Sequence, residues 1–371
     1  MNKKLLSLMM ASAMLVPGAL FLGGCEHDHV YGEWTTKTAA TCEEKEVEVR
    51  KCECGAEETR EGDPATGHTY YPMYSYDASG HWRNASCGHS LRTDAGAHID
   101  ANTDGVCDVC KRGAVVKIGE SYFSTVQAAV DSIVDKSVAT TIEFVSAQVG
   151  GGVVVDGQNV VFEMNGYSYT VDQPPVGSAG TETLGFQLLK GSTVTFRNGS
   201  IRTTGTSVKM LIQNYCDLTL EDMVIDASNP NMNCLYALSN NCGDVVIKGN
   251  TIIRADEGQV AFDLWFGMAT VYDEGVSVTF DETFTGGVIG TIEYGATALG
   301  AERFPDWQSR TNLVIKGGNF SAENGISLLR GTADEANIEI TGGRFDFDIT
   351  AYVPGTHQAL EFNGAYTVVE A

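Results

Sequence analysis

The chain contains 371 residues, with 48 Asp or Glu against 24 Lys or Arg, and its formal net charge is −24. This balance excludes a nucleic-acid-binding protein, which needs clustered cations to displace the counterions of phosphate groups. It also disfavours charge-driven docking on anionic lipid. A hydrophobic content of 43% provides for a sizeable core and excludes a chain that is disordered throughout.

Residues 1–24 have the composition of a secretory signal peptide, with a basic start, an apolar stretch from Leu5 to Leu22 and small residues at the end. Pro17 and the terminal glycines weaken the alternative of a membrane span. The Leu-Gly-Gly-Cys sequence ending at Cys25 resembles the lipobox of bacterial lipoproteins. The resemblance implies that Cys25 is lipidated and holds the protein on the extracellular face of the cell membrane. Plain secretion and an uncleaved anchor are the alternatives.

Cysteine and histidine are concentrated in residues 25–113. So small a module has too little core to hold itself, and this density therefore predicts cross-linking. Interleaved histidines favour a metal, with zinc as the expected ion, because imidazole contributes nothing to a disulfide framework. Disulfides and unpaired thiols are the alternatives. The candidate ligands are His29, Cys42, Cys52, Cys54, His68, His81, Cys87, His98, Cys107 and Cys110.

These residues fall into two sub-repeats. The first includes T-C, C-E-C-G and A-T-G-H sequences, and the second ends with D-A-N-T-D-G-V-C-D-V-C at residues 100–110. The patterns resemble Cys/His-rich modules that recur in surface proteins of anaerobic Gram-positive gut bacteria. The resemblance covers residues 26–113 and implies a small metal-stapled spacer.

Two departures from the family pattern concern the ligand sets. Arg83 and Ala85 stand where the family offers a further His and Cys. The second site is therefore either degenerate or completed by His81, Cys87, His98 and the Cys107/Cys110 pair. In addition, one residue separates Cys52 from Cys54, instead of the two that favour a thiolate chelate turn.

The stretch from Asp100 to Asp108 begins like a calcium loop, with oxygen ligands at Asp100, Asn102 and Asp104, a glycine next and Asp108 at position nine. Position twelve should be a bidentate acid, but it is Lys111. The favoured interpretation is an Asx-rich turn that positions the neighbouring cysteines. A shorter calcium loop closed by Asp108 is the alternative.

Residues 114–371 begin with a short helical pattern. Thr125 is a candidate N-cap, and apolar residues follow it at helical spacing from Val126 to Ile133. A strand is expected at residues 141–145. After this strand the helical period ends.

An eight-residue pattern then recurs, with apolar residues at positions one, three and eight and a polar turn between them. Alternation predicts strands, and a repeat of this length predicts stacked structural units with a common core. Phe196, Leu220 and Ile247 should therefore lie over one another in a dry column. The copies begin at residues 160, 194, 218, 245, 313 and 338, and a hidden turn is expected at 276–283.

This part resembles the right-handed parallel β-helix family of pectin-lyase-like folds. Residues 117–133 are similar to the cap that begins such domains, and residues 340–370 are similar to their last coil and closing hairpin. The predicted fold class is therefore mostly β, with an N-terminal cap helix and a Cys/His-rich module before it.

The sequence identifies no catalytic residue. Glycosidases of this fold use a Gly-His-Gly motif, whereas the single His after residue 110, His357, lies in Gly-Thr-His-Gln. The interruption between residues 253 and 312 instead combines aromatic rings with acids, a pattern typical of sugar binding. The candidate glycan-binding residues are Asp263, Trp265, Tyr272, Tyr294 and Trp307. The alternative is that these rings pack this excursion onto the flank of the stack.

Three functions are consistent with these features. The favoured one is a non-catalytic, lipid-anchored cell-surface protein that presents the β-helix for adhesion or for binding an extracellular glycan or cell-wall polymer. The alternatives are an extracellular polysaccharide lyase or glycoside hydrolase acting in the β-helix groove, and a purely structural envelope protein. The fold permits catalysis, but the residues do not require it.

Overall fold

The computed structural model describes residues 28–228, 234–268 and 271–371. The predicted signal peptide and the predicted lipidation site, Cys25, lie outside the described residues. The chain divides into two compact units, one ending at Gly96 and the other beginning at Ala97. Strands account for 47% of the structure and helices for 6%. Within the described ranges, no helix is both long enough and apolar enough to cross a membrane.

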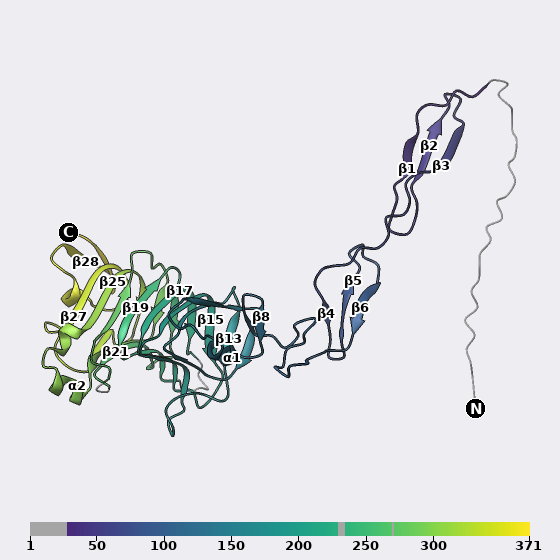
Figure 1. Cartoon of the computed structure of the whole chain (residues 1–371). Coiled ribbons are helices and arrows are strands. Elements are labelled where there is room, and N and C mark those ends of the chain that lie inside the picture. Colours follow the sequence, from purple (N-terminus) through teal and green to yellow (C-terminus); the bar gives the residue numbers. More distant parts are fainter. Residues whose placement is uncertain (1–27, 229–233, 269–270) are drawn as a thin grey trace, which may run out of the picture. The chain divides into compact units, whose positions relative to one another are not determined.

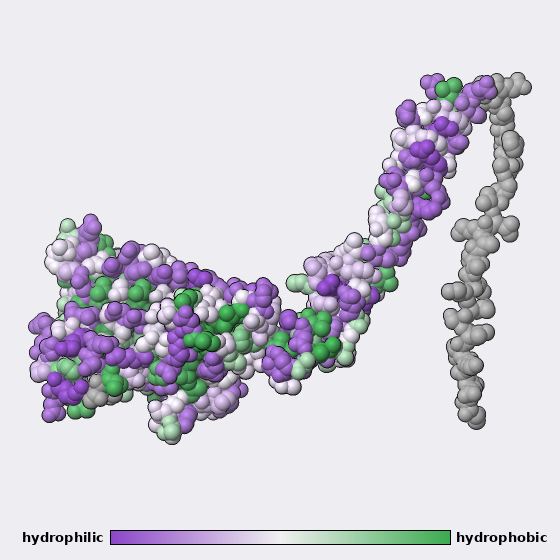
Figure 2. Space-filling model, viewed as in Figure 1, coloured by the Kyte–Doolittle hydropathy of each residue, from purple (hydrophilic) through white to green (hydrophobic). Residues whose placement is uncertain are grey.

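The first unit contains two small antiparallel sheets and very little core. Among its described residues, the buried ones are Val49, Cys52, Gly80, His81 and Ala85. Its outer surface is mainly hydrophilic (Figure 2). The strands therefore need support from elsewhere, because small sheets with one thin apolar face are only marginally stable in water. The sheets consist of β1 (Thr35–Thr38), β2 (Val47–Lys51) and β3 (Glu57–Glu61), and of β4 (Ser75–Tyr76), β5 (His81–Asn84) and β6 (Arg92–Gly96).

The β-rich part of the second unit opens with a hairpin, followed by the short helix that the sequence predicts. In helix α1 (Val126–Asp131) the Thr125 side chain accepts a hydrogen bond from Ala128 N, which satisfies a free N–H of the first turn. The apolar face of α1, with Val126 and Ala129, belongs to the common core. In the chain, α1 follows β7 (Val116–Ile118) and β8 (Ser121–Phe123) and precedes β9 (Thr140–Phe144).

After β9 the chain alternates between two sheets of parallel strands (Figure 1). The larger sheet contains β12 (Asn159–Glu163), β15 (Thr193–Thr203), β17 (Asp217–Asp226), β19 (Gly243–Lys248), β22 (Val276–Phe280), β25 (Thr311–Ser321) and β27 (Asn337–Phe345). The smaller sheet contains β11 (Val153–Asp156), β14 (Leu184–Leu189), β16 (Met210–Asn214), β18 (Tyr236–Asn240), β21 (Val260–Phe266), β24 (Thr291–Ala296) and β26 (Ile326–Leu328).

Shorter elements lie between the strands of these two sheets. They are β10 (Gln148–Gly150), β13 (Ser168–Val171), β20 (Ile252–Arg254), β23 (Gly287–Ile289), α2 (Ala298–Arg303) and the 3₁₀ turns at Trp307–Arg310 and Thr350–Tyr352.

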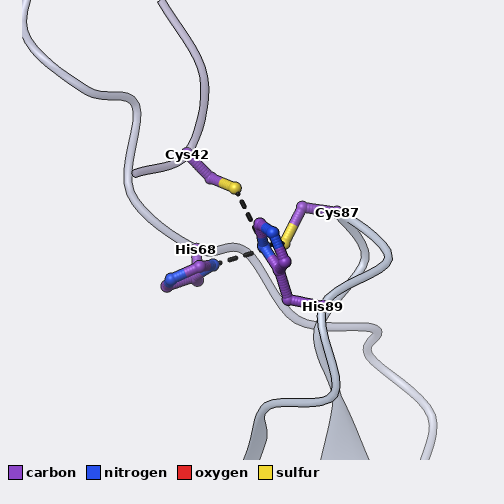
Figure 3. Close-up of side chains that lie close together, drawn as sticks. All are labelled: Cys42, His68, Cys87 and His89. Atoms are coloured by element: carbon purple, nitrogen blue, oxygen red, sulfur yellow. Dashed lines mark hydrogen bonds between the residues drawn. The ribbon is translucent and has the colours of Figure 1, made fainter. Parts of the chain in front are cut away.

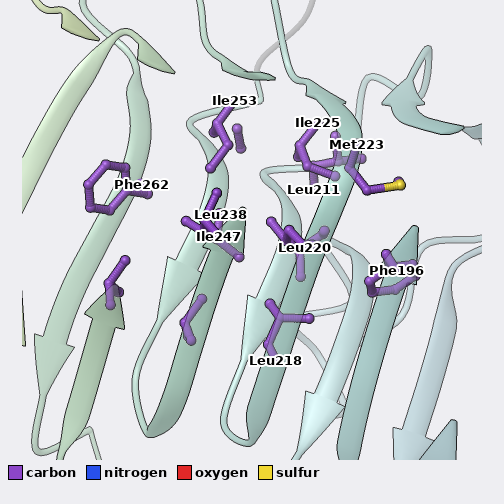
Figure 4. Close-up of a cluster of buried hydrophobic side chains, with 14 of the residues drawn as sticks. Phe196, Leu211, Leu218, Leu220, Met223, Ile225, Leu238, Ile247, Ile253 and Phe262 are labelled. Carbon is purple, nitrogen blue, oxygen red and sulfur yellow. The ribbon is translucent and has the colours of Figure 1, made fainter. Parts of the chain in front are cut away.

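The predicted dry column is confirmed. Phe196 pairs in register with Leu220, and Leu220 pairs with Ile247, on parallel strands. All three side chains are buried and lie along the inside of the stack (Figure 4). The hidden turn is also present, because β22 lies between β19 and β25 and places Phe280 beside Ile247. The repeated sequence pattern therefore encodes one core column of residues from successive coils.

The stack ends in an antiparallel hairpin. Strands β28 (His357–Phe362) and β29 (Ala365–Glu370) pair with each other, and β29 pairs with β27. This arrangement confirms the predicted closing hairpin. The reversal of strand direction ends the parallel ladder.

Candidate metal centres and a surface cavity

One group of side chains in the first unit has the composition of a metal centre. The ligand atoms of Cys42, His68, Cys87 and His89 all lie within 4.8 Å of one another. Cys42 lies in the loop between β1 and β2, and His68 lies between β3 and β4. Cys87 and His89 belong to the turn between β5 and β6. The group therefore joins the two small sheets of this unit (Figure 3).

The imidazoles point their Nδ1 atoms at the sulfurs. Cys42 Sγ lies 3.2 Å from His89 Nδ1, and His68 Nδ1 lies 3.3 Å from Cys87 Sγ. Cys87 Sγ is also 3.4 Å from His89 Nδ1. Two sulfur and two imidazole donors are a set that zinc binds in tetrahedral structural sites.

A carboxylate stands behind both rings. Glu43 Oε1 lies 3.6 Å from His68 Nε2, and Glu43 Oε2 lies 3.9 Å from His89 Nε2. One carboxylate thus faces the Nε2 atoms of both rings while their Nδ1 atoms face the thiols. Partners of this kind fix the orientation and tautomer of metal-binding histidines.

The two thiols of this group have different acidities. The side chain of His68 and the N–H of His89 stabilise the Cys87 thiolate and lower its pKa to about 6. Desolvation and the neighbouring Cys87 raise the pKa of Cys42. Both cysteines carry free thiols. A thiolate is the form that binds a metal, so Cys87 is prepared for coordination near neutral pH.

This grouping differs from the grouping expected from the sequence. Cys87 was expected beside His81 and His98, but it lies with Cys42 and His68 from the first sub-repeat. His89, which was not among the candidate ligands, completes the set. The Cys-Gly-His spacing of residues 87–89 was the available signal.

A second group in the same unit consists of His29, Cys52 and Cys54, with ligand atoms that also lie within 4.8 Å of one another. Cys54 Sγ lies 3.2 Å from His29 Nδ1. A tight turn with Gly55 at φ 89° follows β2, and Gly55 N donates to Cys52 O at 2.8 Å. The turn brings both sulfurs to one side despite their one-residue separation.

The second unit contributes His98, Cys107 and Cys110, whose ligand atoms lie equally close to one another. Cys110 Sγ is 3.4 Å from His98 Nδ1. Desolvation opposes ionisation of Cys107, but hydrogen bonds from backbone groups, first that of Cys110, outweigh it and lower the pKa to about 6. His81 belongs to the first unit, where it is buried on β5 and its ring packs edge-on against Tyr74 at 5.1 Å.

The predicted calcium-type loop has its carboxylates turned toward its own N–H groups. Asp100 accepts from the N–H of Asp104 at 3.1 Å and of Gly105 at 3.0 Å. Asp108 accepts from Ala101 N at 2.9 Å, and Asn102 donates its side-chain amide to Asp104. This is the hydrogen-bonding pattern of an Asx-rich turn. The close-set ligand groups of the described residues do not include these oxygens.

The prediction of glycan binding is wrong for two of the five residues. Tyr294 and Trp307 are buried and pack against each other with ring centroids 5.9 Å apart. The Tyr294 hydroxyl donates to Thr311 O at 2.7 Å and accepts from Asn337 N at 3.0 Å. Both rings therefore hold the excursion onto the stack and are not available to a ligand.

Tyr272 is half-buried and stacks on Tyr215, with ring centroids 4.2 Å apart and planes inclined by 26°. This contact accounts for one face of each ring. Neither tyrosine lines the cavity that contains the two other predicted glycan-binding residues.

Asp263 and Trp265 lie on β21 and line a cavity of about 220 Å³ on the smaller sheet. The other lining residues are Met210, Gln213, Tyr236, Ser239, Asn241, Met268, Glu293 and Leu329. Two carboxyl groups and a half-buried indole ring thus line one cavity on this sheet.

Burial changes the acidity of both carboxyl groups in this cavity. Desolvation raises the pKa of Asp263 to about 8, although the Asn240 N–H and the Ser239 hydroxyl donate to it at 2.6 and 3.0 Å. Desolvation also raises the pKa of Glu293, whose Oε2 lies 3.4 Å from the Tyr236 hydroxyl. A carboxyl group that stays protonated near neutral pH, as Asp263 does, is a candidate for proton donation or for hydrogen bonding to a ligand.

Comparison with family models, with curated proteins and with solved structures gives no match for this chain.

Proposed function

We propose that this protein is a lipid-anchored component of the outer cell surface. In this proposal residues 25–113 form a zinc-stapled spacer, and residues 114–371 form a right-handed parallel β-helix of the pectin-lyase-like type that binds a glycan. The lipid on Cys25 joins the chain to the membrane. The signal-like residues 1–24 and the acidic, hydrophilic exterior support an extracellular location.

One observation carries the spacer part of the proposal, namely the group formed by Cys42, His68, Cys87 and His89. It contains four ligands of the types that zinc prefers, it has an outer carboxylate, and it lies where the unit has almost no apolar core. Zinc would replace the missing core, since metal binding to a folded site contributes directly to folding.

Metal analysis of the purified full chain tests this part. We expect bound zinc, and we expect the Cys42→Ser variant to lose one equivalent. His357→Ala is the matched control, because His357 lies in the closing hairpin and hydrogen-bonds Thr356. A chain that carries no zinc and whose module cysteines are fully oxidised would contradict the proposal.

The cavity on β18, β21 and β24 supports glycan binding by residues 114–371, which we call the β domain. Aromatic faces cover the C–H surface of a sugar while acids and amides bind its hydroxyl groups, and Trp265, Asp263 and Gln213 meet there. A glycan array probed with the full chain tests this part. Binding that persists in Trp265→Ala would contradict the cavity as the site.

A hydrolase is the second candidate, favoured by the pairing of Asp263 with Glu293 on adjacent strands. Glycosidases use two carboxyl groups that flank the scissile glycosidic bond, one of them kept protonated. A lyase is less well supported, since the described residues that line the cavity include no Lys or Arg base. Release of reducing sugar by the wild type, and its loss in Asp263→Asn, would identify the hydrolase.

A further inference from the structure

We propose that the cavity beside Trp265 selects a sugar that carries a free amino group, and that it rejects uronates. The inference rests on the proposed glycan binding and specifies its ligand. It follows from the acceptor groups that the cavity gathers, from its apolar wall and from the charges that line it.

The floor of the cavity is a single polar row across consecutive strands. Gln213 pairs in register with Ser239, Ser239 with Asp263, and Asp263 with Glu293. Neighbouring strands in a sheet lie about 4.8 Å apart, so the two acids are direct neighbours on one face. Two such acids repel each other when both are ionised, and a cation bound between them removes that cost. Burial keeps Asp263 protonated near neutral pH in the empty cavity, and a bound ammonium group would stabilise its ionised form. A uronate would instead bring a negative charge beside Glu293.

A buried amide side chain lines the same space. Asn241 lines the cavity and is 2% exposed, and its Oδ1 has no hydrogen-bond donor among the described residues. An unsatisfied buried acceptor is costly, and a ligand that brings an N–H or O–H removes the penalty. Asn241, Asp263 and Glu293 thus give the cavity three acceptor side chains. An ammonium group has three N–H donors and no acceptor.

The wall of the cavity is suited to the ring that carries this amine. The Trp265 indole lies against Gly295, where an added Cβ would come within 2.8 Å of a ring carbon. The glycine therefore lets the indole lie close to the sheet. An indole face packs on the C–H surface of a pyranose and attracts a cation. Met210 and Leu329 extend the apolar surface.

The charges of the residues that line the cavity match a sugar with a free amino group. No Lys or Arg lines the cavity in the part of the chain that the structure describes, while two acids do. At about 220 Å³ the cavity is smaller than the roughly 300–1,000 Å³ of sites for drug-sized ligands. It is therefore suited to one sugar ring of a chain. These features fit a glucosamine-type residue with a free amine.

Calorimetric titration of the zinc-loaded full chain tests the inference. The probes are short glucosamine oligosaccharides, their fully N-acetylated counterparts, and oligogalacturonate of equal length. We expect the free-amine form to bind at least tenfold more tightly than the acetylated form, and galacturonate to show no binding. Asp263→Asn and Glu293→Gln should each lose at least tenfold in affinity for the free-amine form.

Glu339→Gln is the control for diffuse attraction between a cationic sugar and an acidic protein. It removes the same charge from an exposed position on β27, outside the cavity. Equal weakening by Glu339→Gln and Asp263→Asn would overturn the inference. Equal binding of the amine and acetylated forms would overturn amine selection but leave glycan binding intact. The absence of binding to these probes and to a glycan array would remove both proposals.

Discussion

At the scale of single residues, the candidate zinc group depends on a neighbour that does not itself bind the metal. Glu43 faces the Nε2 atoms of both His68 and His89. It therefore favours the tautomer in which Nδ1 is free to bind a metal. The ligand types alone do not reveal this role.

We predict that Glu43→Gln weakens zinc binding by about 10- to 100-fold, the usual effect of losing an outer-shell partner. Competition with a chromophoric chelator measures the change. Glu44→Gln is the control, because it removes the same charge one residue away. Equal affinities for the wild type and Glu43→Gln would show that the carboxylate does not orient the rings.

A second prediction at the scale of single residues concerns Asp263 and the pH dependence of stability. Its pKa is about 8 in the folded protein because burial disfavours the carboxylate, whereas the ordinary value is 3.8. The fold thus prefers the protonated form, and the resulting stability is complete below about pH 4 and is lost as the pH rises through about 8.

We therefore expect the free energy of unfolding of the wild type to fall between about pH 4 and pH 8, and to fall less in Asp263→Asn. Urea unfolding at several pH values measures the difference. Equal pH dependence of the two proteins would mean that folding does not raise the pKa of Asp263.

At the scale of elements, the repeated strand is the unit of stability. Leu220 on β17 lies between Phe196 and Ile247 and is fully buried. Phe162 and Phe196 extend the same column with stacked rings 4.7 Å apart. Such a column has little room to relax around a lost side chain.

We predict that Leu220→Ala lowers the free energy of unfolding of the β domain by about 2–5 kcal/mol. Urea unfolding followed by circular dichroism measures this change. Thr219→Ala is the matched control on the same strand, because Thr219 is half-buried and its side chain points away from the column. A loss below about 1 kcal/mol for Leu220→Ala would contradict tight packing.

The sequence predicts these strands well because each position in the pattern has one environment. Phe196, Leu220 and Ile247 occupy the same position in their repeats, so alternation alone identifies the inside. The prediction fails for Tyr294 because the strand that contains it, β24, is not recognised within the interruption between residues 253 and 312. It fails for Trp307 because this residue begins a 3₁₀ turn, outside the strand pattern. Aromatic composition does not reveal which way a ring points when the period is lost.

The sequence predicts the ligand types of the candidate metal site, but it does not predict which cysteines and histidines come together. Cysteine and histidine types indicate the metal. However, Cys42 and His68 come from one sub-repeat and Cys87 from the next, and sub-repeats look like independent units in a sequence. Only the folded chain shows that one ligand group joins them.

At the scale of the whole molecule, residues 28–96 and the β domain are stabilised by different interactions. The strands of residues 28–96 surround very few buried side chains, whereas the β domain has a continuous apolar core. Metal removal should therefore affect these parts unequally.

We predict that a zinc chelator makes residues 28–113 sensitive to protease within minutes while residues 114–371 remain intact. Limited proteolysis with mass spectrometry of the fragments measures this. The zinc-saturated chain is the control, and Cys42→Ser should resemble the chelated wild type. Cleavage that starts in the β domain, or no change on chelation, would contradict a metal-dependent spacer.

The reversed hairpin at the end of the β domain has a consequence for how such proteins vary in length. Each coil contributes its own layer to the core, and the first and last layers are covered by α1 and by β28–β29. A gene that duplicated or deleted one whole coil would leave both covers unchanged. Length is then free to drift in whole-coil steps, and the reach of the molecule becomes a trait that selection adjusts without redesigning its ends.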